Sequence, residues 1–165
     1  MRGFKMLRVL AFLLFATPVV AADISGRASV VDGDTIEISG ERIRLNGVDA
    51  PESRQTCTDA VGREYRCGKD AAFALDEFLA ASRPTICVAL GKDRYKRVIA
   101  DCQRADGASV NSWLVANGWA LDWVKYSKGR YASEQLSAKA DRLGIWRGEF
   151  QLPCEFRAKG GKAKC

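Results

Sequence analysis

A regular alternation of apolar and charged residues over positions 35–45 restricts the fold of this chain more than any other feature. On each side of the pair Ser39-Gly40, isoleucine or leucine occupies every second position, and charged residues lie between them. A period of two is typical of a strand with one buried face, and serine followed by glycine favours a turn. The segment therefore predicts an antiparallel hairpin whose apolar face is formed by Ile36, Ile38, Ile43 and Leu45.

Other segments carry signals for further strands and for helices. The runs TICVAL (85–90) and RVIADC (97–102) predict two strands around the charged turn GKDRYKR. The polar stretch 53–69 is expected to be a loop. Helices are expected from Asp70 to Ser82, ended by Pro84, and from the N-cap Ser109 to Gly118. A last helix, ended by Gly144, is expected from the helical spacing of Ala132, Leu136, Ala140 and Leu143.

The expected order is three strands, a helix, two strands and two helices, which places the chain in the α+β class. The roughly 140 residues that follow the N-terminal segment are enough for one domain with its own core. Five short strands in a domain of this size favour a closed or nearly closed barrel. An OB-type five-stranded β-barrel with three packed α-helices is one such arrangement.

The first 22 residues have the order of a secretory signal peptide, in which basic residues precede an apolar run and small residues follow. The alternative is a membrane anchor, but the apolar run over 9–15 is much shorter than the roughly 20 residues that span a bilayer. We therefore expect an exported protein, periplasmic or secreted, with no membrane attachment after removal of residues 1–22. A folded domain over 23–157 and a basic tail over 158–165 would remain.

The charge balance is compatible with a phosphate-bearing partner. The chain has 26 lysines and arginines against 20 acidic residues, a formal net charge of +6, and three of the basic residues lie within the first eight positions. The exported chain would be only mildly basic. A positive balance suits a polyanion without requiring one.

The chain has an even number of cysteines, which in an exported protein favours disulfides. Sequential pairing is predicted because two cysteines lie symmetrically about the turn 91–96, two flank a polar loop and two bracket the tail. The pairs are Cys57 with Cys67, Cys87 with Cys102, and Cys154 with Cys165. A zinc site is the alternative, but the sequence has no CxxC motif and no histidine.

The absence of histidine excludes hydrolases and nucleases that depend on an imidazole. The remaining chemistry belongs to carboxylates and arginines. Asp34 and Asp49 lie at the ends of the predicted strands, and Glu52 follows a few residues later. Carboxylate and carbonyl oxygens favour Ca²⁺ or Mg²⁺. Arg44 and Arg97 could grip a phosphate, because a guanidinium matches its oxygens bidentately.

Several motifs in combination resemble the staphylococcal nuclease-like, or thermonuclease, family. They are DGDT at 32–35, Arg44, GVDAPE at 47–52, DRYxR at 93–97 and GIWRGEF near the end. The resemblance runs from about Ile24 to Arg157. It implies the OB-type barrel with three helices, and it implies cleavage of phosphodiesters in DNA and RNA that leaves 3′-phosphates.

Carried over position by position, the resemblance also implies site residues. Calcium ligands fall on Asp34, Asp49 and the main-chain carbonyl of Ala50, and the general base falls on Glu52. The phosphate-clamping arginines fall on Arg44 and Arg97. Asp32 matches a carboxylate near the metal, and Tyr95 matches a phosphate-binding tyrosine. Trp123 is the nearest counterpart of a second pocket aromatic, although it also fits an ordinary core tryptophan.

Two departures from the family pattern bear on these assignments. Ala50 replaces a threonine, which should be tolerated because the ligand there is a carbonyl. Lys96 replaces a glycine in the turn before Arg97, so a positive φ at this position would strain the turn.

The sequence thus predicts an exported, monomeric, Ca²⁺-dependent nuclease that prefers single-stranded DNA and RNA and has little sequence specificity. The alternative is a non-catalytic OB-fold module that binds nucleic acid or another polyanion. Retention of the acidic residues together with both arginines favours the enzyme. A calcium-binding structural protein would leave the arginines unexplained.

Overall fold

The alternating segment forms an antiparallel pair of strands, as predicted from the sequence. The computed structural model describes residues 23–158 and 165, and in it β3 (Thr35–Ile38) pairs with β4 (Glu41–Leu45). The register places Ile36 opposite Ile43. All four apolar residues of the pattern are at most 1% exposed, so this hairpin contributes directly to the core.

Six strands form the main sheet, in the order β1-β8-β9-β4-β3-β2. The other four are β1 (Ile24–Gly26), β2 (Ala28–Asp32), β8 (Thr85–Lys92) and β9 (Val98–Arg104). Neighbouring strands are antiparallel except β4 and β9, which are parallel. No ladder joins β1 to β2 within residues 23–158, so closure into a barrel is not seen in the hydrogen bonds. The two outer strands are nevertheless consecutive in the chain, with only Arg27 between them.

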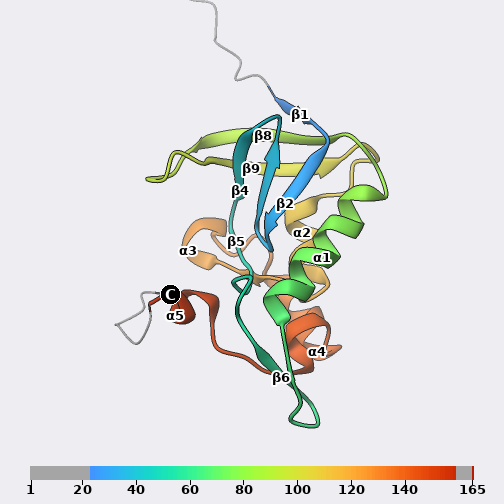
Figure 1. Cartoon of the computed structure of the whole chain (residues 1–165), viewed down its shortest axis with the longest axis vertical. Coiled ribbons are helices and arrows are strands. Elements are labelled where there is room, and N and C mark those ends of the chain that lie inside the picture. The colour runs from blue at the N-terminus through green and yellow to red at the C-terminus, as the bar shows by residue number, and fades with distance from the viewer. Residues whose placement is uncertain (1–22, 159–164) are drawn as a thin grey trace, which may run out of the picture.

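Three longer helices accompany the sheet, so the fold is a mixed α+β fold (Figure 1). They are α1 (Cys67–Ala80), α2 (Val110–Ala116) and α4 (Ala132–Ala140). Helix α1 begins three residues earlier than the sequence indicated. Ser109 caps α2 as predicted, because its hydroxyl accepts a hydrogen bond of 3.2 Å from the Ser112 amide. Residues of β3, β4, α1 and α2 line the principal core.

Helix α4 forms as predicted, but the apolar residues that indicated it do not form its buried face. Leu136 is 70% exposed, Leu143 is 39% exposed, and Ala132 and Ala140 also lie on the exposed side. The helix instead buries Ala138 and attaches through polar side chains. Glu134 accepts from the Ser112 hydroxyl at 2.9 Å, and Gln135 accepts from the Asp122 amide at 2.9 Å. An apolar stripe could not reveal a face that is held by hydrogen bonds.

The predicted loop over 53–69 also contains strands. β6 (Cys57–Asp59) pairs with β7 (Glu64–Tyr65) and with β11 (Gly148–Glu149), which follows the 3₁₀-helix η1 (Gly144–Arg147). The Asp59 carboxylate accepts from the amides of Val61 and Arg63, both at 3.0 Å, and so closes the turn between β6 and β7. These strands are two or three residues long, too short to show a periodic pattern.

The remaining elements lie around the site described below. β5 (Val48–Asp49) pairs with β10 (Leu121–Asp122), α3 is Val124–Ser127, and α5 is Pro153–Arg157. In Figure 1 the C-terminal helix α5 returns to the part of the molecule that holds β5 and α3.

All three disulfides form as the sequence predicted. Cys57 pairs with Cys67, Cys87 with Cys102, and Cys154 with Cys165, with Cα atoms 5.7, 4.1 and 5.7 Å apart. Three disulfides are typical of proteins outside the reducing cytosol. The expected signal peptide over 1–22 lies outside the described residues. Among the residues that are described, no helix has the length and apolar character needed to cross a membrane.

Candidate active site

Two buried carboxylates converge on one guanidinium group. Asp34 stands immediately before β3 and Asp49 ends β5, and they are 7% and 3% exposed. Arg44 Nη1 lies 2.5 Å from Asp34 Oδ2, and its Nη2 lies 3.3 Å from Asp49 Oδ1. Both carboxylates therefore face the guanidinium group of Arg44, which supplies a positive charge between them.

The strand register explains why Arg44 reaches this position. Arg44 lies opposite Thr35 on the β3–β4 ladder, and its side chain points away from the face of Ile43 and Leu45. The Leu45 amide donates to the Asp34 carbonyl at 2.9 Å, which fixes the end of the hairpin next to the carboxylate. The Arg44 side chain is only 11% exposed, so its charge acts where water screens it weakly.

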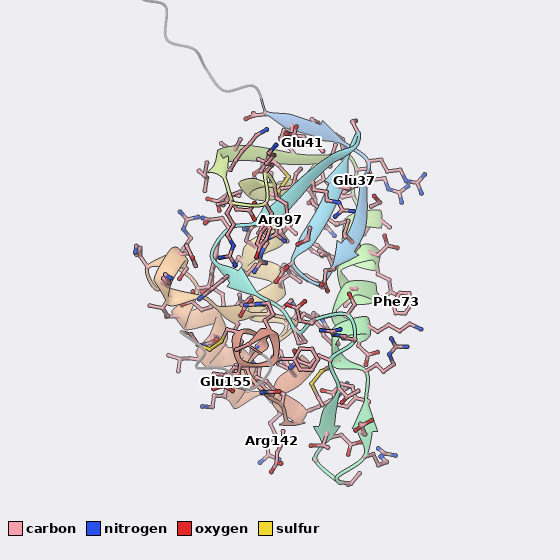
Figure 2. All side chains as sticks on the ribbon, turned by 60° about the vertical axis from the view of Figure 1, so that its left-hand side comes forward. Glu37, Glu41, Phe73, Arg97, Arg142 and Glu155 are labelled. Carbon is pink, nitrogen blue, oxygen red and sulfur yellow. A yellow bond between two sulfur atoms is a disulfide. The ribbon has the colours of Figure 1, made fainter. Side chains whose placement is uncertain are left out.

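Arg97 joins the same group of residues through a hydroxyl. It follows the turn between β8 and β9 (Figure 2). Its Nη1 donates to Thr35 Oγ1 at 3.4 Å. Thr35 Oγ1 in turn donates to Asp34 Oδ1 at 3.1 Å. A continuous chain of polar contacts thus runs from Arg97 to Asp34 and Arg44. Thr35 is the last residue of the DGDT motif, but the sequence did not indicate its contact with Arg97.

The turn before Arg97 is held by Asp93. Its Oδ2 accepts from Arg97 Nε at 2.8 Å, and its Oδ1 accepts from the amides of Tyr95 and Arg97 at 2.8 and 3.0 Å. Burial opposes ionisation here, but the hydrogen bonds from Arg97 outweigh it and lower the pKa of Asp93. Lys96 has a φ of 67°, so it does occupy the left-handed conformation that glycine tolerates better.

Glu52 lies on a loop that packs against the start of α1. Its amide donates to Gln55 Oε1 at 3.2 Å, and its carbonyl accepts from the Gln55 amide at 2.7 Å. A Cβ atom added at Gly68, in the first turn of α1, would lie 1.7 Å from the Glu52 carbonyl oxygen. Only glycine allows this approach, so α1 and Gln55 together fix the backbone of Glu52.

Arg157, in α5, is a member of the site that the sequence patterns did not indicate. Its Nη1 donates to Asp49 Oδ1 and to Glu52 Oε1, both at 2.8 Å, and its Nη2 donates to Asp49 Oδ2 at 3.0 Å. Burial works to lower the pKa of Arg157, but the hydrogen bonds to Asp49 and Glu52 outweigh it and raise that pKa. The more than 100 residues between these partners hid the contact from sequence patterns.

Aromatic side chains flank the arginines. The Trp123 ring centre lies 5.7 Å from the guanidinium carbon of Arg44 and 5.5 Å from that of Arg157, and Tyr126 packs edge-on against it at 4.5 Å. Tyr95 is 64% exposed, and its ring centre lies 5.6 Å from the guanidinium carbon of Arg97. Trp123 is therefore next to the site rather than deep in the core. Tyr126 was not foreseen.

The acidic residues repel one another at close range. Burial raises the pKa of Asp49, and the charge of Asp34 adds to this, while Arg157 and Arg44 oppose it. Burial likewise raises the pKa of Asp32, whose Oδ1 accepts from the Gly33 amide at 2.8 Å. A positive charge next to these carboxylates therefore offsets both the cost of their desolvation and their mutual repulsion.

The donor set fits a hard divalent cation. Asp34 and Asp49 supply carboxylate oxygens around a position that already accommodates positive charge, and Ala50 follows directly. The Ala50 amide donates to Asp34 Oδ2 at 3.0 Å, so this backbone lies against the carboxylate. Within residues 23–158 and 165, no three or more acidic or thiol side chains are gathered as a ready metal cage. Carbonyls, water and substrate would have to complete the coordination.

The sequence of this chain matches the family described as staphylococcal nuclease homologue over residues 42–148, well over half its length. The chain belongs to this family. The matched segment includes Arg44, Asp49, Glu52 and Arg97, whereas Asp34 and Arg157 lie beyond its two ends.

Alignments with three named relatives extend beyond residues 42–148 and cover most of the chain. It is 54% identical over 150 residues to the succinoglycan biosynthesis protein ExoI of Rhizobium meliloti (strain 1021), covering 90% of this chain and 78% of that protein. It is 31% identical over 150 residues to an uncharacterized endonuclease of Escherichia coli, covering 87% and 91%. It is 35% identical over 148 residues to endonuclease YhcR of Bacillus subtilis (strain 168), covering 79% of this chain but 12% of that protein.

Proposed function

We propose that this member of the staphylococcal nuclease family is an exported, calcium-dependent nuclease. It hydrolyses phosphodiester bonds of DNA and RNA with little sequence specificity and leaves 3′-phosphates. The observation that carries the proposal is the convergence of Asp34 and Asp49 on Arg44, in contact with Arg97 through Thr35. Two relatives that are named endonucleases support the reaction class.

The finer fold proposed is the OB-type five-stranded barrel of the family. Its support is the continuity of β1 and β2 at Arg27, which makes the two outer strands of the sheet halves of one bent segment. Residues 23–157 would form this domain, preceded by the signal peptide over 1–22 and followed by the basic tail over 158–165. The three disulfides support export to the periplasm or beyond the cell. We expect a monomer.

Asp34, Asp49 and the carbonyl of Ala50 would hold the calcium ion. Once bound, the ion supplies Lewis-acid polarisation of a phosphoryl oxygen and lowers the pKa of water. Both carboxylates are buried, and Asp34 is already oriented by the Ala50 amide and by Thr35, whereas Asp49 is held by arginine side chains.

Glu52 would receive a proton from the attacking water or orient that water by a hydrogen bond. Arg44 and Arg97 would bind the nonbridging phosphate oxygens and stabilise the charge that accumulates on phosphorus. Both arginines are less than 30% exposed, so their attraction for that charge is stronger than in open water. Tyr95, Asp32 and Trp123 are the proposed substrate-binding residues around this centre.

A single strand should reach the site more readily than a stiff duplex. Tyr95 is exposed beside Arg97, and Tyr126 is exposed against Trp123. Aromatic faces stack on any base, which gives binding without sequence readout. Equal cleavage rates for single strands and a stable duplex would contradict this preference.

The test is cleavage of heat-denatured DNA and of RNA by the purified chain, with calcium and with excess chelator. We expect cleavage only with calcium, 3′-phosphate ends on the products, and a loss of turnover of about 10²-fold or more in Glu52→Gln. Binding without cleavage by the wild-type chain would instead indicate the polyanion-binding module. Full activity in chelator would contradict the calcium requirement.

The relative named for succinoglycan biosynthesis calls for one further assay. A bacterial exopolysaccharide should be incubated with the same preparation. Because the proposed site is built to hold phosphate, we expect nucleic acid to be cleaved and the polysaccharide to remain intact. Cleavage of the polysaccharide alone would overturn the proposed function.

A further inference from the structure

We propose that Arg157 is an internal cation that competes with calcium for Asp49, so that calcium binding requires the guanidinium group to leave. The inference rests on the proposed function, since it concerns the same site. It concerns a residue of α5, beyond the segment 42–148 that matches the family.

Arg157 occupies both oxygens of Asp49. Its Nη1 and Nη2 lie 2.8 and 3.0 Å from Asp49 Oδ1 and Oδ2, which is the parallel two-bond arrangement that arginine forms with carboxylates. Asp49 is 3% exposed, so its carboxylate has little access to any other partner. A metal ion that coordinates this carboxylate would therefore compete with the positive charge of Arg157 for the same two oxygens.

Arg44 does not obstruct the site in the same way. It contacts Asp49 through a single nitrogen at 3.3 Å and directs its shorter contact, 2.5 Å, to Asp34. Arg157, in contrast, bridges Asp49 and Glu52, with Nη1 also 2.8 Å from Glu52 Oε1. The proposed ligand and the proposed base are thus held by one side chain.

The position of Arg157 is built into the fold of the C-terminal segment. Gln55 Nε2 donates to the Gln151 carbonyl at 2.6 Å, Pro153 is buried, and the guanidinium carbon of Arg54 lies 5.8 Å from the Phe156 ring centre. Helix α5 is therefore attached to the loop that carries Glu52. The attachment presents Arg157 to the carboxylates while leaving its side chain 34% exposed, with a route to solvent.

This exchange has a physical advantage for the site. Without Arg157 or a metal ion, the two buried carboxylates of Asp34 and Asp49 would share the single positive charge of Arg44. The guanidinium group of Arg157 compensates the remaining negative charge until a divalent ion replaces it. The observed free energy of calcium binding is then the free energy of the ion's interaction with the carboxylate minus that of the Arg157 interaction it replaces.

The test is the calcium dissociation constant, measured by calorimetry on the full chain with its disulfides intact. Arg157→Gln should bind calcium about tenfold more tightly than wild type, because loss of a charge-assisted pair removes the competitor. Arg130→Gln is the matched control. It removes the same charge from a pair with Asp101 outside the site, and it should bind calcium as wild type does.

A second variant distinguishes the effect of the two parallel hydrogen bonds from the effect of the positive charge at position 157. Arg157→Lys keeps the positive charge but cannot form two parallel hydrogen bonds, so its calcium affinity should fall between those of wild type and Arg157→Gln. It also provides an answer if Arg157→Gln does not fold. Equal or weaker calcium binding in the variants than in wild type would overturn the exchange.

The same measurements distinguish this failure from failure of the proposed function. If wild type binds calcium and cleaves DNA while all variants share its dissociation constant, only the exchange is wrong. If calcium binds neither wild type nor Arg157→Gln, both the exchange and the calcium-dependent nuclease are wrong.

Discussion

At the scale of single residues, the direction of Arg97 depends on Asp93. Asp93 holds the end of the β8–β9 hairpin through an ion pair of 2.8 Å with Arg97 and two hydrogen bonds that it accepts from backbone amides. The positive φ of Lys96 shows that this turn requires a left-handed backbone conformation. The guanidinium group of Arg97 then reaches Thr35 rather than open solvent. Asp93 is thus a positioning residue for the proposed phosphate clamp.

Replacement of Asp93 by asparagine should lower turnover without unfolding the chain. Asparagine can still accept from the two amides but no longer pairs with the Arg97 charge. We expect kcat on single-stranded DNA to fall about tenfold, against about 10²–10³-fold for Arg97→Ala, because the arginine remains present but less well oriented. Thermal unfolding should stay close to wild type. A kcat unchanged in Asp93→Asn would contradict the positioning role.

At the scale of elements, the first turn of α1 supports the backbone of Glu52. Gly68 allows the Glu52 carbonyl to approach far closer than any Cβ would permit. The nearby disulfide between Cys57 and Cys67 ties the loop after Glu52 to the same turn. A helix that carries none of the proposed catalytic side chains thereby determines where one of them lies.

Replacement of Gly68 by alanine should disturb both stability and activity. The added methyl group has no space, so the free energy of unfolding should fall by roughly 1–3 kcal/mol and kcat should fall as Glu52 shifts. Urea denaturation and turnover on single-stranded DNA measure the two effects. Lys69→Ala, at the next and exposed position, is the control and should change the free energy of unfolding by no more than about 0.5 kcal/mol. Wild-type values for Gly68→Ala would show that the contact is unimportant.

At the scale of the whole molecule, recognition of a polyanion should depend on ionic strength. The chain carries an excess of basic residues, and arginines surround the site. Each phosphate contact with a single strand releases counterions, so kcat/KM should fall by roughly tenfold between about 50 and 200 mM salt. At saturating substrate kcat should change little. A kcat/KM independent of salt at fixed calcium would argue against phosphate contacts.

The alternation over 35–45 identified the central hairpin, because a strand with one buried face has apolar residues at every second position. The same alternation places Arg44 on the strand face opposite the core. The face of α4 could not be predicted, since Gln135 and Glu134 attach it by hydrogen bonds while Leu136 stays exposed. Local patterns detect apolar burial but not polar attachment.

The candidate site was predictable only in part, for a related reason. Asp34, Asp49 and Arg44 are close in the chain, and the β3–β4 hairpin followed by β5 brings them together. Arg157 reaches Asp49 across 108 positions of sequence, and no periodicity connects them. Thr35 is an ordinary strand threonine until Arg97 is seen beside it. Contacts between distant segments require the fold.

The meeting of β1 and β2 at Arg27 has a consequence for behaviour at high concentration. Unpaired strand borders are templates on which other chains can add and begin to aggregate. Here the outer strands are three and five residues long and turn into one another. A second chain could pair only with a short, bent edge strand, so edge-to-edge addition of strands into fibres is disfavoured.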